Sequence, residues 1–242
     1  MSYSAGFSRI DISVYEPDMA MLGYGMPYNR VNGVAVPIFA RAMVLRQDDT
    51  VIAYLCTEQC FAAPALRTKL IERLQRKHPD RGFTQHNVCW SATHNHSAPN
   101  GYCHYTTHLG MNFGFSPLVF ETLLERFVAV ILAADDALEP AVLSIGSAEI
   151  APDEPVAFNR SLGAWKRNPE AKTSVAVSRT TVTLRVDGAD GRAMGLLNWF
   201  AVHGTSIHSD NTEIHSDNKG LAAIEVEHRA GDLGFREDFV AI

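Results

Sequence analysis

The chain has 242 residues, of which 46% are hydrophobic and 20% are charged, so it can bury a substantial core and does not belong to the disordered class. Its 21 Lys and Arg are outnumbered by 27 Asp and Glu, and the formal net charge is −6. No basic run stands out, which leaves nucleic-acid binding without electrostatic support. The length allows one large domain or two small ones, and we predict a single domain over residues 1–242.

The N-terminal stretch MSYSAGFSRIDIS has no charged segment followed by an apolar one, so it does not resemble a signal peptide. No apolar run approaches the roughly 20 residues of a membrane span. The compartment therefore stays open: the chain is cytosolic, or its targeting segment is absent from this numbering. The four cysteines form no CxxC pair, and free buried thiols are expected unless export allows a bridge.

The first half of the chain predicts a hairpin, two helices and a strand. The apolar stretches 40–46 and 51–56 flank the turn QDDT and predict paired strands. Leucines that recur every four residues predict a helix over 64–77. The segment NVCWSAT (87–93) predicts a strand, and a Ser-Pro pair opens a helix predicted over 117–136.

The second half predicts mainly strands. Segments 141–150 and 174–186 have strand patterns, and the nearly unbroken apolar run 193–203 predicts a central strand covered on both faces. The triplet SDN precedes a helix predicted from about residue 219 to residue 229. The fold class that follows is α/β (α+β), with mixed β-sheets covered by helices.

Histidines follow two of these strands. The segment SATHNHSAP carries His94 and His96 where an apolar strand gives way to Pro99, and the run 193–203 ends on His203. In a strand, residues two apart point to the same face, so we expect the first two imidazoles side by side. In sheets covered by helices, the carboxyl ends of strands are the usual ligand site. An ordinary polar turn is the alternative interpretation of the His-Asn-His segment.

This arrangement is suited to a catalytic zinc. Zinc prefers neutral imidazole nitrogens and four ligands, and His94 and His203 could supply two of them. His96 would then be free to bind substrate or to move a proton. A bound zinc lowers the pKa of water from about 15.7 to about 7, which supplies hydroxide to attack a carbonyl carbon.

Other histidines are weaker candidates. His104 and His108 have a helical metal spacing, but their segment is rich in Gly and Thr and lacks the Glu of an HExxH motif. His208 and His215 lie in the polar loop after the long strand, where either could line the site or simply be solvated. The remaining histidines are expected on the surface: His78, His86 and His228.

Several segments together resemble the neutral (alkaline) ceramidases. SATHNHSAPNGY is similar to their SATHTHSGPGGY-type segment, NRSLGAWKRNP to NRS-x-x-A-Y-x-x-NP, and NWFAVHGTSIHSDNTEIHSDNKG to NWFAVHGTSM…SDNKG. GFSRIDIS…MLGYG and ARAMVL match the DITGP…MGYA and RLxARAF pieces. The order agrees from about residue 6 to the last residue, which makes the resemblance specific.

The resemblance implies a function and assigns roles to four residues. It implies a zinc-dependent hydrolase that cleaves the amide of ceramide (N-acylsphingosine), or of a similar N-acyl lipid, to a fatty acid and an amino alcohol. His94 and His203 would bind Zn²⁺, and His96 would lie in the active site. Arg160 would contact the reacting group, where a permanent positive charge can stabilise an oxyanion. Without the resemblance, Arg160 would be interpreted as an ordinary surface cation.

The chain also departs from the family pattern. HTHSGPGG is replaced by HNHSAPNG, so Asn95 and Asn100 are expected to reshape the lip of the site. The family's further zinc ligands, a Glu and a Tyr, and its GDVSPN segment lie downstream of the matched residues. Residues 1–242 are therefore expected to be the N-terminal portion of a longer catalytic domain. The alternative is a short homologue that completes its site from the polar loop, with His208, Asp210 or Asp217.

Two other functions stay open. One is hydrolysis of another amide or ester by the same metal chemistry, and the other is a non-catalytic lipid-binding module with the same fold. The aromatic-rich loop 102–115 could line an acyl groove or merely pack within itself. A lipid-like substrate would also allow contact with a membrane surface, and nothing in the sequence predicts an oligomeric state.

Overall fold

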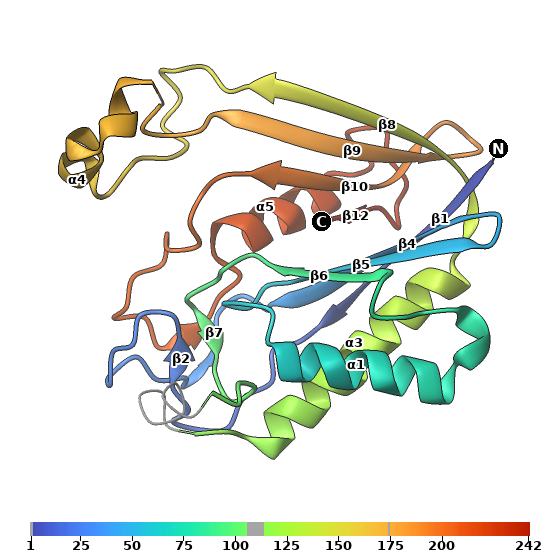
Figure 1. Cartoon of the computed structure of the whole chain (residues 1–242), viewed down its shortest axis with the longest axis horizontal. Helices are drawn as coiled ribbons and strands as arrows, with labels where there is room; N and C mark the ends of the chain where they lie inside the picture. Colours follow the sequence, from blue (N-terminus) through green and yellow to red (C-terminus); the bar gives the residue numbers. More distant parts are fainter. Residues whose placement is uncertain (1, 106–113, 174) are drawn as a thin grey trace.

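The computed structural model describes residues 2–105, 114–173 and 175–242, and its centre is one eight-stranded mixed sheet (Figure 1). The strand order is β12-β10-β9-β8-β1-β4-β5-β6. Neighbouring strands are antiparallel except for the parallel pairs β5–β6 and β10–β12. The strands are β1 (Tyr3–Asp11), β4 (Phe39–Gln47), β5 (Thr50–Thr57), β6 (Val88–Ala92), β8 (Glu139–Glu149), β9 (Thr180–Gly188), β10 (Ala193–Phe200) and β12 (Val240–Ala241).

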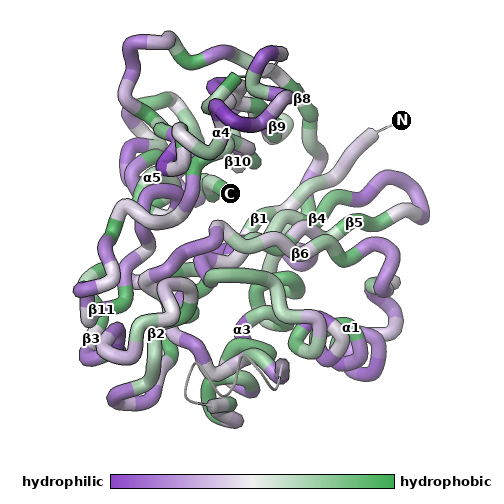
Figure 2. The backbone as a smooth tube through the Cα atoms, turned by 60° about the vertical axis from the view of Figure 1, so that its left-hand side comes forward, coloured by the Kyte–Doolittle hydropathy of each residue, from purple (hydrophilic) through white to green (hydrophobic). Residues whose placement is uncertain are grey.

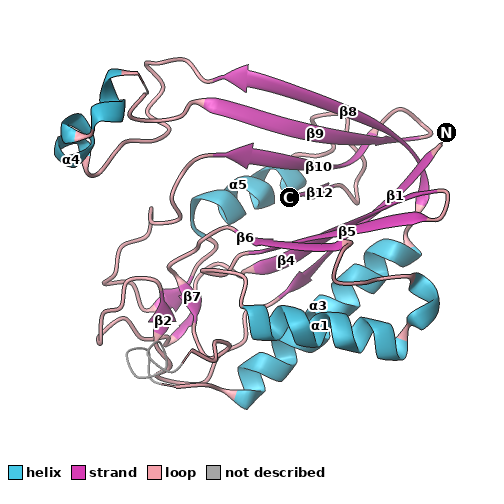
Figure 3. Ribbon diagram, viewed as in Figure 1, coloured by secondary structure: helices cyan, strands magenta, loops and turns pink. Residues whose placement is uncertain are grey.

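Helices cover this sheet, which confirms the predicted α+β class. Figure 3 shows α1 (Pro64–Lys77) and α3 (Pro117–Asp136) on one side of β1, β4, β5 and β6, while α5 (Asp217–His228) lies beside β10 and β12. α1 connects the parallel strands β5 and β6, as such strands require a crossover. Smaller elements fill the connections: β2 (Met21–Leu22) with β7 (Ala98–Pro99), β3 (Gly33–Val34) with β11 (Glu213–Ile214), α4 (Leu162–Arg167), η1 (Pro79–Arg81) and η2 (Pro169–Lys172).

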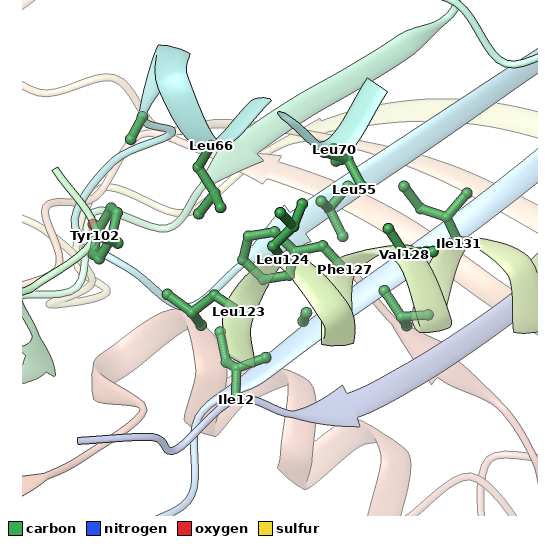
Figure 4. Packing of buried hydrophobic residues seen from close by; sticks show 14 of the residues in the cluster. Ile12, Leu55, Leu66, Leu70, Tyr102, Leu123, Leu124, Phe127, Val128 and Ile131 are labelled. Carbon is green, nitrogen blue, oxygen red and sulfur yellow. The ribbon is translucent and has the colours of Figure 1, made fainter. Parts of the chain in front are cut away.

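The main core lies between these helices and the sheet (Figure 4). Leu66 and Leu70 of α1 and Phe127 of α3 are fully buried there, as their helical spacing predicts. The side chain of Ser116 accepts a hydrogen bond from the amide of Val119 at 3.1 Å and caps α3, which confirms the predicted helix start. In Figure 2 α3 and the strands β4 and β5 are largely hydrophobic, whereas the turn between β4 and β5 is hydrophilic.

Two predicted strand boundaries were wrong. The strand predicted over 174–186 begins at Thr180; residues 175–179 are irregular, and the guanidinium of Arg179 donates to the carbonyl of Ala151 at 2.6 Å. The strand predicted over 193–203 ends at Phe200, whose carbonyl accepts from the amide of Val202 in a tight turn. Residue 174 lies outside the described residues.

β10 is also not the central strand that its composition predicts. It lies last but one in the described sheet, next to the two-residue β12. The first half of β10 is covered on both faces. Met194 and Leu197 belong to one apolar cluster, and Ala193 belongs to a second cluster, against which residues of α5 pack. Its second half is open, and 43% of Trp199 is exposed. Apolar composition therefore indicated burial correctly for only half of the strand.

The sheet bends so that its two ends face each other across a cavity. Strands β8 to β10 form one limb and β4 to β6 the other, as Figure 1 shows. Between the limbs lies a cavity of about 980 Å³ with a mainly apolar lining. The rings of Tyr54 on β5 and Trp199 on β10 approach across it, with centroids 6.3 Å apart. Thr93 and Val202, which flank two of the histidines, also line it.

All four cysteines are free, as predicted, but not all are buried, because Cys89 is exposed on β6. None of the helices in the described parts of the chain is long and apolar enough to cross a membrane. The lobe that carries α4 extends beyond the ends of β8 and β9 in Figure 1. Arg160 lies in this lobe, two residues before the start of α4.

A buried charge cluster connects the end of β5 with α5. Arg41 donates through Nε to Glu227 at 2.9 Å and through a terminal nitrogen to Glu58, and each of these three side chains is at most 4% exposed. Burial raises the pKa of Glu58 to about 7, and the positive charge of Arg41 opposes that rise. Glu58 comes directly after β5, so this cluster lies beneath the loops that carry the histidines.

We expect the Glu58 carboxyl to lower stability as the pH rises. Its folded-state pKa of about 7 exceeds the ordinary value of 4.5, so its stabilising contribution is complete below pH 4.5 and is lost as the pH passes 7. Glu58→Gln cannot titrate at this position. Its free energy of unfolding should therefore increase relative to that of wild type as the pH is raised from about 5 to about 8. Chemical denaturation at both pH values measures this change. The exposed Glu125→Gln is the control, and an equal change in both variants would contradict the assignment.

Candidate metal centre

Three imidazoles meet at one end of the bent sheet. The ring centroids of His94 and His96 are 4.7 Å apart, and the ring of His203 lies 4.7 Å and 4.9 Å from them respectively. The two loops are joined directly, because the amide of His96 donates to the carbonyl of Gly204 at 3.2 Å. One loop follows β6 and the other follows β10, so the curvature of the sheet assembles the cluster.

His94 and His96 are adjacent for a different reason from the one the sequence suggests. β6 ends at Ala92, and His94 has a left-handed backbone with a φ of 61°, so the two residues are not on a strand. The turn brings their Nε2 atoms to 3.2 Å from each other. The ring of His94 is held in place by a contact between its Nδ1 and the carbonyl oxygen of Cys60 at 2.7 Å. His94 is exposed and His96 is only 8% exposed.

Asn95 and Asn100 do not form the lip of the site, which corrects the prediction. Both are 1% exposed. Asn95 donates through Nδ2 to the carbonyls of Glu58 at 3.2 Å and His215 at 2.7 Å, and its Oδ1 accepts from the amide of Ser97 at 2.7 Å. The asparagine between the histidines therefore fastens their turn to two other segments.

The loop of His203 is held by its own set of hydrogen bonds. Nδ1 of His203 contacts the hydroxyl of Thr205 at 2.9 Å, and the carbonyl of His203 accepts from Nδ2 of Asn218 at 2.8 Å. Asp217 is buried, and its Oδ1 accepts from the amide of Ser206 at 3.1 Å. Because Nδ1 is engaged, Nε2 of His203 is the nitrogen left for a ligand.

The electrostatics favour the neutral form of His96 and His203. Burial lowers the pKa of His96 to about 4, and the neighbouring charges of His94 and His203 lower it further, while Asp217 opposes them. Burial and the charge of His94 also lower the pKa of His203. Neutral imidazole is the form that binds zinc. The charge of the exposed Arg160 also lowers the pKa of both groups.

The residues fit a zinc ion. Two nitrogens of a tetrahedral zinc site lie roughly 3.3 Å apart, and the Nε2 atoms of His94 and His96 are separated by 3.2 Å. The ligand atoms of Cys60, His94 and His96 all lie within 4.8 Å of one another. Burial raises the pKa of the Cys60 thiol to about 12, so the thiol is protonated in the absence of a metal. The carbonyl of Cys60 instead orients His94.

The other candidate histidines lie elsewhere. His104 packs its ring against Phe115 and Phe120, with centroids 4.2 Å and 5.1 Å away, and His108 lies outside the described residues. His208 is exposed, and its carbonyl accepts from the amide of Asn211. The three remaining histidines are partly or fully exposed, as predicted: His78, His86 and His228.

The polar and aromatic loops mostly support the fold. Nδ1 of His215 accepts from the amide of Asp217 at 3.0 Å, so this side chain braces the start of α5. In the aromatic-rich loop, Tyr102 is fully buried in the core and Phe115 packs against Phe120, which favours packing over an acyl groove. Tyr105 is exposed, and Phe113 lies outside the described residues.

Sequence reasoning missed the segment that encloses His96. Gly23 lies against the imidazole, and the ring of Tyr24 meets it edge-on with centroids 4.8 Å apart. Both belong to the MLGYG segment, which served only to support the family resemblance. The two residues lie more than seventy positions before His96, and nothing in their spacing indicates a site.

Comparison with known proteins now identifies the family. A family model described as neutral/alkaline non-lysosomal ceramidase, N-terminal, matches residues 3–242. The chain belongs to the neutral/alkaline ceramidase family. Neutral ceramidases from Mycobacterium tuberculosis and Pseudomonas aeruginosa are each 30% identical to it, over 98% and 100% of this chain respectively.

Solved ceramidase structures have the same fold. The crystal structure of the Pseudomonas aeruginosa neutral ceramidase matches all of this chain with a TM-score of 0.91 and 30% identity, and a ceramidase complexed with C2 matches with a TM-score of 0.90. The chain covers 38% and 37% of those two chains. It likewise spans 38% of the mycobacterial ceramidase and 35% of the Pseudomonas one.

Proposed function

We propose that this ceramidase-family chain provides the histidine centre of a zinc-dependent amide hydrolase that acts on ceramide or a similar N-acyl lipid. The observation that carries the proposal is the meeting of His94, His96 and His203, each from the motif expected to supply it. The names of the relatives and of the C2 complex support the substrate class. The apolar cavity beside the cluster favours an acyl compound over a small polar amide.

Each residue has a proposed role. His94 and His203 would hold Zn²⁺ through Nε2, since Cys60 and Thr205 engage their other nitrogens. When bound, zinc polarises a carbonyl oxygen and acidifies water. His96 is neutral and would take a proton from the attacking group and return it to the leaving amine. The guanidinium of Arg160 would stabilise the negative charge that develops on the amide oxygen.

We further propose that residues 1–242 act as the N-terminal portion of a longer catalytic domain, as in relatives of which the chain spans just over a third. Two or three imidazoles leave at least one position of a tetrahedral zinc site to be filled. The polar loop is a poorer source for that ligand. Both oxygens of Asp217 face backbone amides of residues 206 and 207, and His215 braces α5.

Fatty-acid release from ceramide tests the proposal, with the longest polypeptide that carries this sequence. We expect a chelator to abolish release and added Zn²⁺, but not Mg²⁺, to restore it. Release from a water-soluble N-acyl compound but not from ceramide would favour the hydrolase of another amide or ester. Binding of ceramide without turnover in any metal condition would identify a non-catalytic lipid-binding module.

A further inference from the structure

The corner formed by Gly23 and Tyr24 is tied to the histidine turn through the backbone. It directly follows β2, in which Leu22 pairs with Ala98 and Met21 with Pro99 of β7. β7 begins two residues after His96. The corner is therefore held at a fixed distance from that imidazole by a short antiparallel ladder.

Gly23 brings its backbone into close contact with the imidazole of His96. Its φ is +129°, a region that residues with a side chain rarely adopt. A Cβ at this position would lie 2.4 Å from Cγ of His96 and less than 3 Å from two further ring atoms. One side of the imidazole is thus enclosed by main chain.

Tyr24 connects the two histidine-bearing loops. Its ring meets the imidazole of His96 edge-on, at 4.8 Å between centroids and 82° between planes. Its hydroxyl donates to the carbonyl of Ile207, in the loop that begins at His203. One side chain therefore contacts His96 with its ring and the His203 loop with its hydroxyl.

His96 differs from its two neighbours in how its ring is held. The Nδ1 atoms of His94 and His203 contact the carbonyl of Cys60 and the hydroxyl of Thr205. Nδ1 of His96 is buried without a hydrogen-bond partner among the described residues, and its Nε2 faces His94. Histidines at metal sites are normally oriented by a hydrogen bond on the second nitrogen. In His96, packing has to replace that hydrogen bond.

We propose that Tyr24 is a positioning residue, which orients His96 by ring packing and couples it to the His203 loop through its hydroxyl. The value of this arrangement for zinc chemistry rests on the proposed function, but the positioning itself does not. Tyr24→Phe removes only the hydroxyl, whereas Tyr24→Leu also removes the ring. Tyr28→Phe is the matched control, because Tyr28 is 60% exposed and its hydroxyl lies 3.4 Å from that of Ser209 on the same polar loop.

The first measurement is the rate at which diethyl pyrocarbonate modifies each histidine of the metal-free protein, followed by mass spectrometry. The exposed His86 is the internal reference, and thermal unfolding confirms that each variant is folded. We expect Tyr24→Leu to raise the rate at His96 about 10-fold, the equivalent of losing one aromatic contact. Tyr24→Phe and Tyr28→Phe should leave His96 as in wild type. Equal rates at His96 in Tyr24→Leu and wild type would overturn the proposal.

The second measurement is zinc affinity, which separates this inference from the proposed function. We expect Tyr24→Leu and Tyr24→Phe to weaken zinc binding by a similar factor of about 10, because both lose the hydroxyl that holds the His203 loop, and Tyr28→Phe to leave it unchanged. If wild type binds no zinc, the proposed function fails while the modification rates still decide the role of Tyr24. If the rate at His96 rises and zinc affinity does not change in either Tyr24 variant, Tyr24 holds His96 but does not hold the His203 loop for the metal, which overturns the coupling half of the inference.

Discussion

Replacing His94 with alanine is expected to weaken zinc binding by at least about 100-fold and to lower fatty-acid release by at least about 1,000-fold. The imidazole of His94 lies 4.7 Å from those of His96 and His203, and its Nδ1 is already held by the carbonyl of Cys60. Its loss would remove a pre-oriented ligand from the cluster. Zinc content after dialysis and initial rates with ceramide measure the two effects.

Three further variants make this experiment specific. His203→Ala should cause a similar loss of zinc, whereas His96→Ala should retain zinc and lose mainly the catalytic rate. This difference separates the proposed ligand pair from a pair formed by His94 and His96. His86→Ala removes an exposed imidazole and is the control. If His94→Ala retained zinc and activity like the control, the proposed centre would be wrong.

The second large effect is expected from Arg160→Ala, which should lower kcat by about 100- to 1,000-fold with little change in zinc content. The reason is that the charge of Arg160 acts on the histidine cluster, where it lowers the pKa of His96 and His203. That charge is available for an amide oxygen that becomes anionic in the transition state. Steady-state kinetics with ceramide should show the loss in kcat rather than in KM, because the interaction strengthens only as charge develops.

Conservative and matched variants test the role of Arg160. Arg160→Lys should recover only part of the activity, because an ammonium cannot reproduce the planar, two-pronged hydrogen bonding of a guanidinium. Arg167→Ala, at the exposed end of the nearby α4, should leave kcat as in wild type. A loss confined to KM in Arg160→Ala would instead assign the residue to substrate binding.

The sequence predicts the elements better than the contacts between them. Local patterns are sufficient for α1 and α3, because leucine spacing and the Ser116 cap act within a few residues. They also place His94 and His203 just beyond two strands. They do not show that β6 and β10, at opposite ends of the sheet order, approach each other, because curvature depends on the packing of the whole sheet.

The same limit explains the errors at the site. An alternating pattern predicted that His94 and His96 share a strand face, but the left-handed backbone of His94 is set by hydrogen bonds to distant segments. Asn95 was expected to reshape the lip of the site, yet its side-chain amide satisfies three backbone groups in the interior. Tyr24 could not be recognised at all, since its two contacts are with residues far away in sequence.

The way Asn95 fastens the histidine turn has a consequence for how the protein is made. Its amide binds the carbonyl of His215, which is 120 residues further along the chain. During synthesis, the turn around His94 emerges long before this partner does, and closing so long a loop is slow. The imidazoles should therefore remain unorganised until the ribosome has passed the start of α5. Zinc supplied to a growing chain should therefore be retained only after that point.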